Sequence, residues 1–339
     1  YFIKHDDGGE QFWMTDGFTV GDGSKTIGEC GSIGQRDGEY SDGAPPYAES
    51  TKGGFDPHAR IPDMDKKLVD AVFLYPTLGL FLDVVTDPDQ ATANARAYNR
   101  WLADYCSAYP DRLHGVAALP LQSVEGAIEE LRFCTKELGF RSAFLRPNPY
   151  NGRPLHHKDF DPVWEAAQEL DIAVGIHGGG AQANLGDDRF PYSESFAMNH
   201  CVVHTFEMMA AAVSLIMGGV CERFPRLRIG FLEASGGWMP AWLDRMDRHF
   251  DDQGMNDLSL TVLPSEIFAR QCYIAYEPVE TTIAFGAQAM GANKILFATD
   301  YPHHDGFWGA AKMIKRLDLD PDVEAQVLGG GAKEFYGLA

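Results

Sequence analysis

The stretch RIGFLEASGGWMPAWLDRMD, residues 228–247, contains the unit that repeats along this chain. RIGFL is a short apolar run, and it ends at an acid, Glu233. A glycine pair follows, and then a longer segment with helix-like spacing. A continuously apolar run before an amphipathic segment is typical of a buried parallel strand and its crossover helix. The open question is why such a strand should end in a carboxylate.

The same alternation continues from about residue 70 to the end of the chain. Helix-like segments such as ATANARAYNRWLADYCSAY and SVEGAIEELRFCTKEL separate short runs that are almost wholly apolar. Strands that alternate with helices predict an α/β fold with a parallel sheet. The runs are DAVFLYP (70–76), GVAALP (115–120), SAFLRP (142–147), IAVGIH (172–177), RIGFLE (228–233), CYIAYE (272–277) and ILFATD (295–300).

The number of these units bears on the architecture. There are seven, whereas a (β/α)8 TIM barrel has eight strands in about 250 residues. The chain therefore forms either an open doubly wound sheet or a barrel with one further strand upstream of Tyr1. No GxGxxG or GxxxxGK[ST] motif follows a strand, which argues against the nucleotide-binding open sheet. We expect the (β/α)8 barrel.

Residues 1–66 have a different composition from the rest. Two β-prone runs flank DDGG and predict a hairpin, and residues 21–60 are rich in Gly, Pro, Ser and Asp. We interpret residues 1–66 as an insertion or cap and residues 67–339 as the barrel. A long loop of this kind often acts as a lid over an active site.

Composition narrows the range of partners. The 339 residues carry a formal net charge of −21 and no run of Lys and Arg, which disfavours nucleic acid, anionic membranes and polyphosphates. No apolar run reaches membrane-spanning length. The six cysteines include no CxxC pair, which is typical of reduced thiols in the cytoplasm.

Polar residues stand at the ends of the apolar runs. A single polar strand end needs only contact with solvent, but His177, Glu233 and Asp300 all end runs that are otherwise apolar. The carboxyl ends of parallel barrel strands meet at one face, and that face carries the chemistry. Imidazole and carboxylate are ligands of Zn²⁺, Mn²⁺ and Fe²⁺, so this combination predicts a divalent metal site. The full set is Tyr75, Pro120, Arg146, His177, Glu233, Glu277 and Asp300.

Several of these stretches resemble one known family. IHGGG (176–180), FLEASGGWMPAWLDRMD (231–247) and FATDYPHHDG (297–306) look like the late-strand motifs of the amidohydrolase-2 family. These are metal-dependent barrels related to aminocarboxymuconate-semialdehyde decarboxylase. GGFDPHARIPDMDKKLVDAVFLYPT (53–77) and FPRLRIGFLE (224–233) also resemble that family, so the similarity covers roughly residues 50–339.

The resemblance implies roles for two residues. His177 matches the metal-ligand His at the end of strand five, and Asp300 matches the Asp of strand eight that binds the metal or the attacking water. The family's HxH-type pair at the end of strand one has no counterpart here, in agreement with a further strand upstream of Tyr1. HDD at 5–7 is a poor substitute because it falls in the predicted hairpin.

Glu233 departs from the family pattern, in which the strand-six position is commonly a His in an HGGG-like turn. A Glu can act as a general base on metal-bound water or can itself bind the metal. It cannot donate to a developing anion as an imidazolium does.

We therefore expect hydrolysis of a small ester, thioester or amide-type carbonyl. The alternatives are decarboxylation of an aromatic or unsaturated carboxylic acid, and a degenerate ligand-binding barrel without metal. Glu233 could also pair with Arg245 or cap the next helix.

Further residues are weaker candidates for the site. His204 lies four residues after His200 and three before Glu207, so it shares a helix face with both, and we expect it to be catalytic. Four residues are expected to bind the substrate: Arg146, Tyr75, Trp238 and His303. Each also has a structural explanation, which is an ion pair for Arg146, core packing for the two aromatic residues and an exposed loop position for the histidine. The expected partner is a small organic molecule, uncharged or weakly anionic. The family resemblance also suggests a homodimer.

Overall fold

The structure is a computed structural model of the 339-residue chain. It describes residues 2–4, 10–15, 18–20, 51–77, 79–80, 82, 85–178, 196–252, 258–303 and 306–338. The predicted turn at DDGG, the HDD triplet, most of the Gly-rich stretch and His304 lie outside these residues.

Seven parallel strands form the central sheet, in the order β10-β9-β8-β7-β6-β5-β4. Each strand overlaps one of the seven apolar runs, and β5 begins two residues before its run, so the predicted parallel α/β sheet is confirmed. In the middle of the sheet, β7 and β8 pair with Gly175 opposite Gly230 and His177 opposite Leu232. The strands are β4 (Val72–Leu74), β5 (Leu113–Ala118), β6 (Ser142–Leu145), β7 (Ala173–His177), β8 (Arg228–Leu232), β9 (Cys272–Tyr276) and β10 (Ile295–Phe297).

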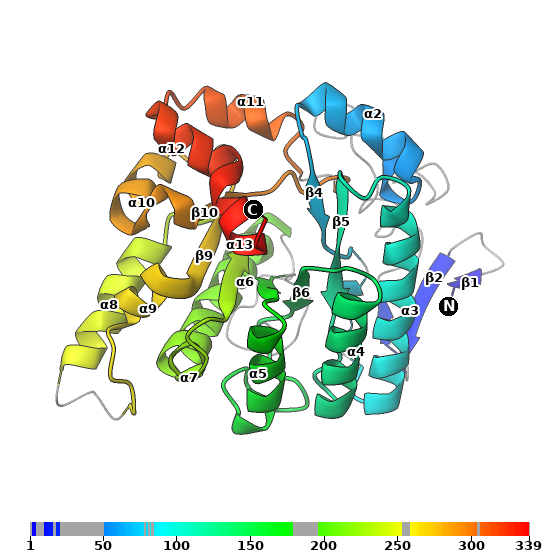
Figure 1. The fold of residues 1–339 in the computed structure, drawn as a ribbon, viewed down its shortest axis with the longest axis horizontal. Helices are drawn as coiled ribbons and strands as arrows, with labels where there is room; N and C mark the ends of the chain where they lie inside the picture. The colour runs from blue at the N-terminus through cyan, green and yellow to red at the C-terminus, as the bar shows by residue number, and fades with distance from the viewer. Residues whose placement is uncertain are drawn as a thin grey trace.

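The sheet curls into a half-barrel with helices around it (Figure 1). Among the described residues β4 and β10 are its two edges, so closure by an eighth strand stays a prediction. The helices that follow the strands are α3 (Pro88–Ser107), α4 (Val124–Lys136), α5 (Asp161–Glu169), α6 (Phe196–Ala212), α7 (Val220–Arg223), α8 (Met239–Asp251), α9 (Pro264–Gln271), α10 (Ile283–Met290), α11 (Ala310–Lys315), α12 (Pro321–Ala325) and α13 (Gly331–Tyr336).

The strands are apolar because both faces of the sheet are covered. Every residue of β6, β7 and β9 is buried. On one face, Leu232, Tyr273 and Leu296 pack against Phe335 and Tyr336 of α13. Burial on both faces explains the continuous apolar runs and leaves the strand ends as the places where polar side chains can point into a cavity.

The described residues before β4 include three short strands, a 3-10 helix at Lys52–Gly54 and an α-helix. β1 (Phe2–Lys4), β2 (Glu10–Thr15) and β3 (Phe18–Val20) pair antiparallel in that order. His58 of α2 (Pro57–Lys67) contacts Tyr109, just after α3 ends, with Nδ1 3.0 Å from Oη. The predicted insertion, its lid role and its boundary at residue 66 stay predictions.

Helix α6 begins a helical stretch that is longer and more apolar than the sequence analysis expected. The window His200–Met217 is long and apolar enough to cross a membrane, so the expectation that no run reaches that length is wrong. Of this window, 44% is buried inside the molecule. A core helix of a globular protein meets the same criterion, and the window alone is weak evidence for a membrane.

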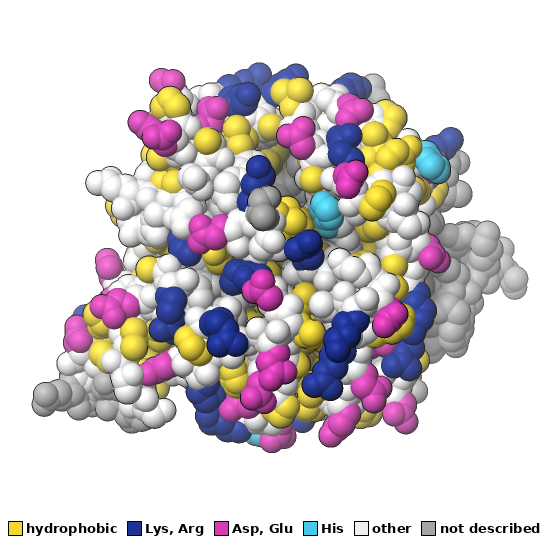
Figure 2. Space-filling model, in the orientation of Figure 1, with side chains coloured by type: hydrophobic (Ala, Val, Ile, Leu, Met, Phe, Trp, Pro, Cys, Tyr) yellow, Lys and Arg dark blue, Asp and Glu magenta, His cyan; other side chains and the backbone are white. Residues whose placement is uncertain are grey.

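The charged surface agrees with the absence of a basic run. On the face in Figure 2, Lys and Arg side chains are interspersed with Asp and Glu.

Candidate functional site

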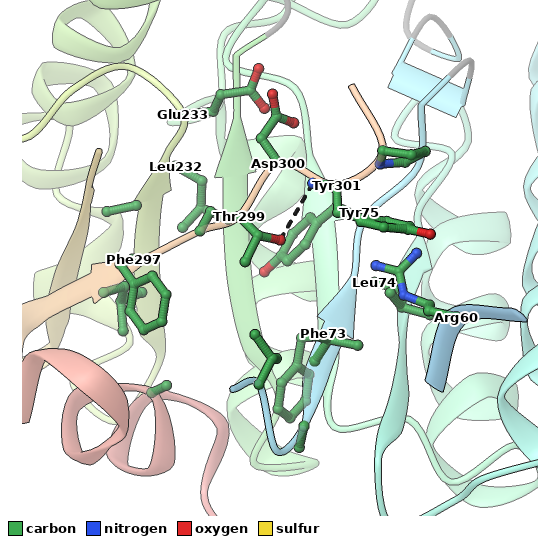
Figure 3. A pocket seen from close by; sticks show the side chains of 18 of the residues that line it. Arg60, Phe73, Leu74, Tyr75, Leu232, Glu233, Phe297, Thr299, Asp300 and Tyr301 are labelled. Carbon is green, nitrogen blue, oxygen red and sulfur yellow. Dashed lines mark hydrogen bonds between the residues drawn. The ribbon is translucent and has the colours of Figure 1, made fainter. Parts of the chain in front are cut away.

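Three predicted residues line one cavity at the carboxyl ends of the strands. His177 is the last residue of β7, Glu233 directly follows β8, and Asp300 lies three residues after β10 ends at Phe297. The cavity has a volume of about 860 Å³, and Tyr75 and His303 also line it. Figure 3 shows Glu233 and Asp300 with their carboxylates in the same part of this cavity.

The backbone at two of these positions is in an uncommon conformation. Glu233 has φ 53° and Asp300 has φ 52°, both in the left-handed region. A residue other than glycine pays about 1–3 kcal/mol for a rarely populated conformation of this kind, which persists only where surrounding contacts hold it. The two carboxylates are therefore presented by turns that the neighbouring structure must stabilise.

Glu233 pairs with His177. Its Oε2 lies 2.7 Å from His177 Nε2, while His177 Nδ1 donates to the carbonyl of Gly178 at 2.7 Å. Burial would raise the pKa of Glu233, but the His177 imidazole, with help from His204 and His303, lowers it to about 2. Glu233 is thus a carboxylate surrounded by imidazoles. Among the residues that the structure describes, the carboxylate of Glu233 forms its ion pair with His177 and none with Arg245.

Asp300 and His303 form a second pair. Asp300 Oδ1 lies 2.9 Å from His303 Nδ1, and His303 Nε2 lies 2.9 Å from Thr77 Oγ1. These contacts link the loop after β10 to the segment after β4, at the two edges of the half-barrel.

His204 enters the same region from α6. It is 7% exposed, and its ring lies 4.2 Å from that of His200, which confirms that the two share a helix face. A Cβ added to Gly178 would lie 3.3 Å from His204 Cδ2 and 3.5 Å from Glu233 O. Burial lowers the pKa of His204 to about 4, and Glu233 opposes this effect. His204 is therefore a neutral imidazole beside Glu233.

Arg146 lies behind the site and does not line this cavity. It is 1% exposed, and its Nη1 donates to the carbonyl of His177 at 3.0 Å. Its Nη2 lies 3.8 Å from Glu207, whose other oxygen accepts from Asn148 Nδ2 at 3.0 Å. This buried group supports His177 from the protein side. Substrate binding by Arg146 stays a prediction.

The two aromatic candidates have different surroundings. Tyr75 lines the cavity, lies 5.7 Å from the His177 ring in a stacked arrangement, and contacts Tyr336 Oη at 3.1 Å. Burial raises the pKa of Tyr75 to about 12. Trp238 does not line this cavity; its Nε1 donates to the carbonyls of Ala234 at 3.0 Å and Ser235 at 2.8 Å. Its part in substrate binding also stays a prediction.

The donor chemistry of the site fits a divalent metal ion. A His whose Nδ1 donates to a backbone carbonyl presents Nε2 in the tautomer that metal-binding histidines use, and His177 has this arrangement. The nearby carboxylates of Glu233 and Asp300 add oxygen donors. In the part of the chain that the structure describes, no three His, Cys, Asp or Glu side chains already surround one metal position.

Two residues of the site were missed by sequence reasoning. Thr77 contacts His303, and Glu280 accepts hydrogen bonds from Gly236 N and Gly237 N, in the turn after Glu233. Thr77 lies within the family-like stretch 53–77, which could have pointed to it. Nothing in the local pattern marks Glu280, because its contacts depend on how two loops meet.

Comparison with known proteins assigns the family. The model of the amidohydrolase family matches residues 36–338, and the chain belongs to this family. The resemblance found in the sequence is thereby confirmed.

Two relatives that match most of this chain are decarboxylases. The 2-amino-3-carboxymuconate-6-semialdehyde decarboxylase of Dictyostelium discoideum is 29% identical over 296 residues, which covers 86% of this chain and 79% of the relative. A gamma-resorcylate decarboxylase of Rhizobium is 28% identical over 283 residues, which covers 76% of this chain and 83% of the relative.

A solved structure shows the same fold. The 5-carboxyvanillate decarboxylase of Novosphingobium aromaticivorans was solved with manganese and 4-hydroxy-3-methoxy-5-nitrobenzoic acid. It is 25% identical to this chain with a TM-score of 0.69, and the match covers 82% of this chain and 79% of that one. Manganese in this structure supports the predicted divalent metal without identifying the ion for this chain.

These comparisons correct the predicted reaction. The expectation of hydrolysis is wrong, because relatives that match most of the chain are decarboxylases. The expectation rested on Glu233 in place of a histidine at one strand end. One residue type does not decide the reaction here, since the structure surrounds Glu233 with the imidazoles of His177, His204 and His303.

Proposed function

We propose that this chain is a metal-dependent decarboxylase of an aromatic or unsaturated carboxylic acid. The observation that carries the proposal is the 2.7 Å pair of Glu233 and His177 on the cavity wall, in a chain whose relatives over most of its length are decarboxylases.

His177 and Asp300 are the residues that would hold the metal ion. A divalent ion held there would supply positive charge, which would favour a bound acid and the negative charge that develops as CO2 leaves. Thr77 and His303 hold Asp300 from one side, and Arg146 holds His177 from behind.

The remaining chemistry is one proton transfer. Decarboxylation breaks the bond between the substrate carbon and its carboxylate carbon, and the electron pair left on the substrate carbon takes up one proton. Glu233 and His303 both line the cavity, and a side chain there can take that proton from water and pass it to the substrate carbon.

The cavity wall suits a flat apolar molecule with polar groups at one end. Phe73, Leu232 and Phe297 line one part, while Glu233 and Asp300 lie at another (Figure 3). An apolar wall excludes water, and it strengthens the electrostatic interactions of the acid bound there.

Carboxyl-labelled acids test the reaction directly. The protein is incubated with Mn²⁺ in D2O and with one acid in each reaction. The three acids are 2,6-dihydroxybenzoate, 5-carboxyvanillate and 2-amino-3-carboxymuconate-6-semialdehyde. We expect labelled CO2 and one deuterium at the carbon that lost its carboxylate in at least one product. If all three acids remain unchanged, the proposal is wrong.

Two finer features belong with this proposal. We expect an eighth strand between the edges β4 and β10, because unpaired strand edges are otherwise prone to aggregation. We also expect a homodimer. A crystal structure that shows what pairs with the free edges of β4 and β10 tests the first, and light scattering tests the second.

A further inference from the structure

The loop after β9 reaches back to the turn after β8. The carboxylate of Glu280 accepts three backbone N–H groups: Glu277 N at 2.7 Å, Gly236 N at 3.0 Å and Gly237 N at 3.0 Å. Hydrogen bonds from an amide to a carboxylate are about twice as strong as those between neutral groups. Glu280 therefore joins two neighbouring strand ends through its side chain.

The turn that Glu280 contacts is strained. Glu233 has φ 53° and Ser235 has φ 55°, two left-handed residues within three positions. Neither is a glycine, and each such residue costs about 1–3 kcal/mol. The turn needs contacts from outside to keep this conformation, and the amides of Gly236 and Gly237 provide points of attachment.

Neighbouring groups leave this turn little freedom. A Cβ added to Gly236 would lie 2.2 Å from Tyr276 Cδ2, and one added to Gly237 would lie 2.5 Å from Thr282 Oγ1. On the other side, Trp238 Nε1 donates to the carbonyls of Ala234 and Ser235. Tyr276 and Thr282 flank the Glu277–Glu280 loop in sequence, so the same segment packs on the turn and bonds to it.

We propose that Glu280 is a positioning residue: by holding the amides of Gly236 and Gly237 it keeps the Glu233 carboxylate against His177. The inference rests on the proposed function, because it assigns Glu233 a part in the reaction. In the protein without a bound metal ion, the carboxylate of Glu233 lies 2.7 Å from His177, and this is the contact that Glu280 maintains. A displacement of about 1 Å in a reacting group can lower a rate by about 100-fold.

The test compares Glu280→Gln with a matched control, Glu222→Gln. Glu222 also accepts a backbone amide with both carboxylate oxygens, Thr261 N at 3.0 and 3.1 Å, but joins no strand-end turn of the site. In CO2 release, we expect Glu280→Gln to lower kcat by about 10- to 100-fold with KM within about 2-fold. Glu222→Gln should retain the wild-type kcat. Glu280→Asp should recover part of the loss, because its carboxylate can still accept amide hydrogens.

A second readout does not depend on activity. In a crystal structure of the full Glu280→Gln protein without metal, we expect Glu233 to lie farther from His177 than 2.7 Å. In solution, we expect the amides of Gly236 and Gly237 to exchange their hydrogens faster than in the wild type. An unchanged contact, with wild-type exchange and kcat, would overturn the inference. If the wild type itself releases no CO2, the proposed function fails, and the crystal structure and exchange rates still decide the role of Glu280.

Discussion

At the residue scale, Glu233 is unusual in its backbone conformation, its contact with His177 and its pKa. Its backbone is left-handed, its carboxylate contacts His177 Nε2 at 2.7 Å, and its pKa is lowered to about 2. A charged acid held in a strained turn beside imidazoles is an arrangement typical of a catalytic site rather than of fold stability alone.

Replacing Glu233 by Gln removes the carboxylate and keeps the size of the side chain. We expect CO2 release to fall by about 100-fold or more, because an amide cannot take up or pass on a proton as a carboxylate does. Steady-state assays measure the effect, and circular dichroism checks the fold. The control is Glu165→Gln on the exposed face of α5, which should keep wild-type activity. Equal activity of both variants would contradict the role of Glu233.

Arg146 gives a prediction on stability. It is 1% exposed, bonds to the carbonyl of His177 and lies 3.8 Å from the buried Glu207. Arg146→Met leaves the Glu207 carboxylate without this cation, and we expect a loss of about 3 kcal/mol in the free energy of unfolding. Urea unfolding measures the loss.

The control for Arg146 is an exposed ion pair. Lys158 Nζ lies 3.7 Å from Asp161, and the Lys158 side chain is 69% exposed. Lys158→Met should change the free energy of unfolding by about 0.5 kcal/mol or less. A similar small change in Arg146→Met would show that the buried cluster does not support His177.

At the element scale, β7 and the segment after β4 are in contact beneath the site. A Cβ added to Gly175 would lie 2.6 Å from Tyr75 Oη and 2.8 Å from Leu232 Cδ1. The glycine therefore allows Tyr75 to pack directly on the strand, below its stacking partner His177.

Gly175→Ala tests this contact. We expect a loss of about 1–3 kcal/mol, because the added methyl group overpacks the space between Tyr75 and Leu232. Thermal unfolding measures it. The control is Gly329→Ala, where no atom lies within 4 Å of the added Cβ, and its stability should be unchanged or slightly higher. An equally stable Gly175→Ala variant would mean that Tyr75 can move without cost.

The sheet was predictable because its strands are covered on both faces. That burial makes each run continuously apolar, and the period of strand and helix is then visible in the sequence. The same pattern placed His177 at the end of β7 and Glu233 just after β8. Asp300 was read as the end of its strand but follows Phe297 by three residues, since the chain turns there with φ 52° at Asp300.

Contacts between elements were not predictable. The contacts of Arg146 with His177 O and Glu207 could not be read from its position at a strand end, and its predicted role in substrate binding stays a prediction. The role of Glu280 could not be predicted, because the sequence does not show which loops contact each other in the folded protein. The reaction class was also misread, because the imidazoles around Glu233 come from three other segments of the chain.

At the scale of the whole molecule, residues from both edges of the half-barrel line the same cavity. Thr77 after β4 and His303 after β10 contact each other, and both line the cavity with Glu233 and Asp300. A metal ion held by strand ends from different parts of the sheet would therefore stabilise the arrangement of the whole sheet.

Metal removal should lower the stability of the folded protein. A ligand present at 100 times its Kd stabilises the folded state by about 2.7 kcal/mol. We expect treatment with a chelator to lower Tm by several degrees and added Mn²⁺ to restore it, as calorimetry can measure. A His177→Ala variant should show no such response. The same Tm with and without Mn²⁺ in the wild type would contradict a metal site at these strand ends.

The most direct measurement is the rate of CO2 release as a function of bound Mn²⁺. Metal-free protein is loaded stepwise and assayed on carboxyl-labelled 2,6-dihydroxybenzoate, 5-carboxyvanillate and 2-amino-3-carboxymuconate-6-semialdehyde, with metal content determined by elemental analysis. We expect no release without metal and a rate proportional to bound Mn²⁺ on at least one acid. Release that persists in metal-free protein, or no release at full loading, would contradict a metal-dependent decarboxylase.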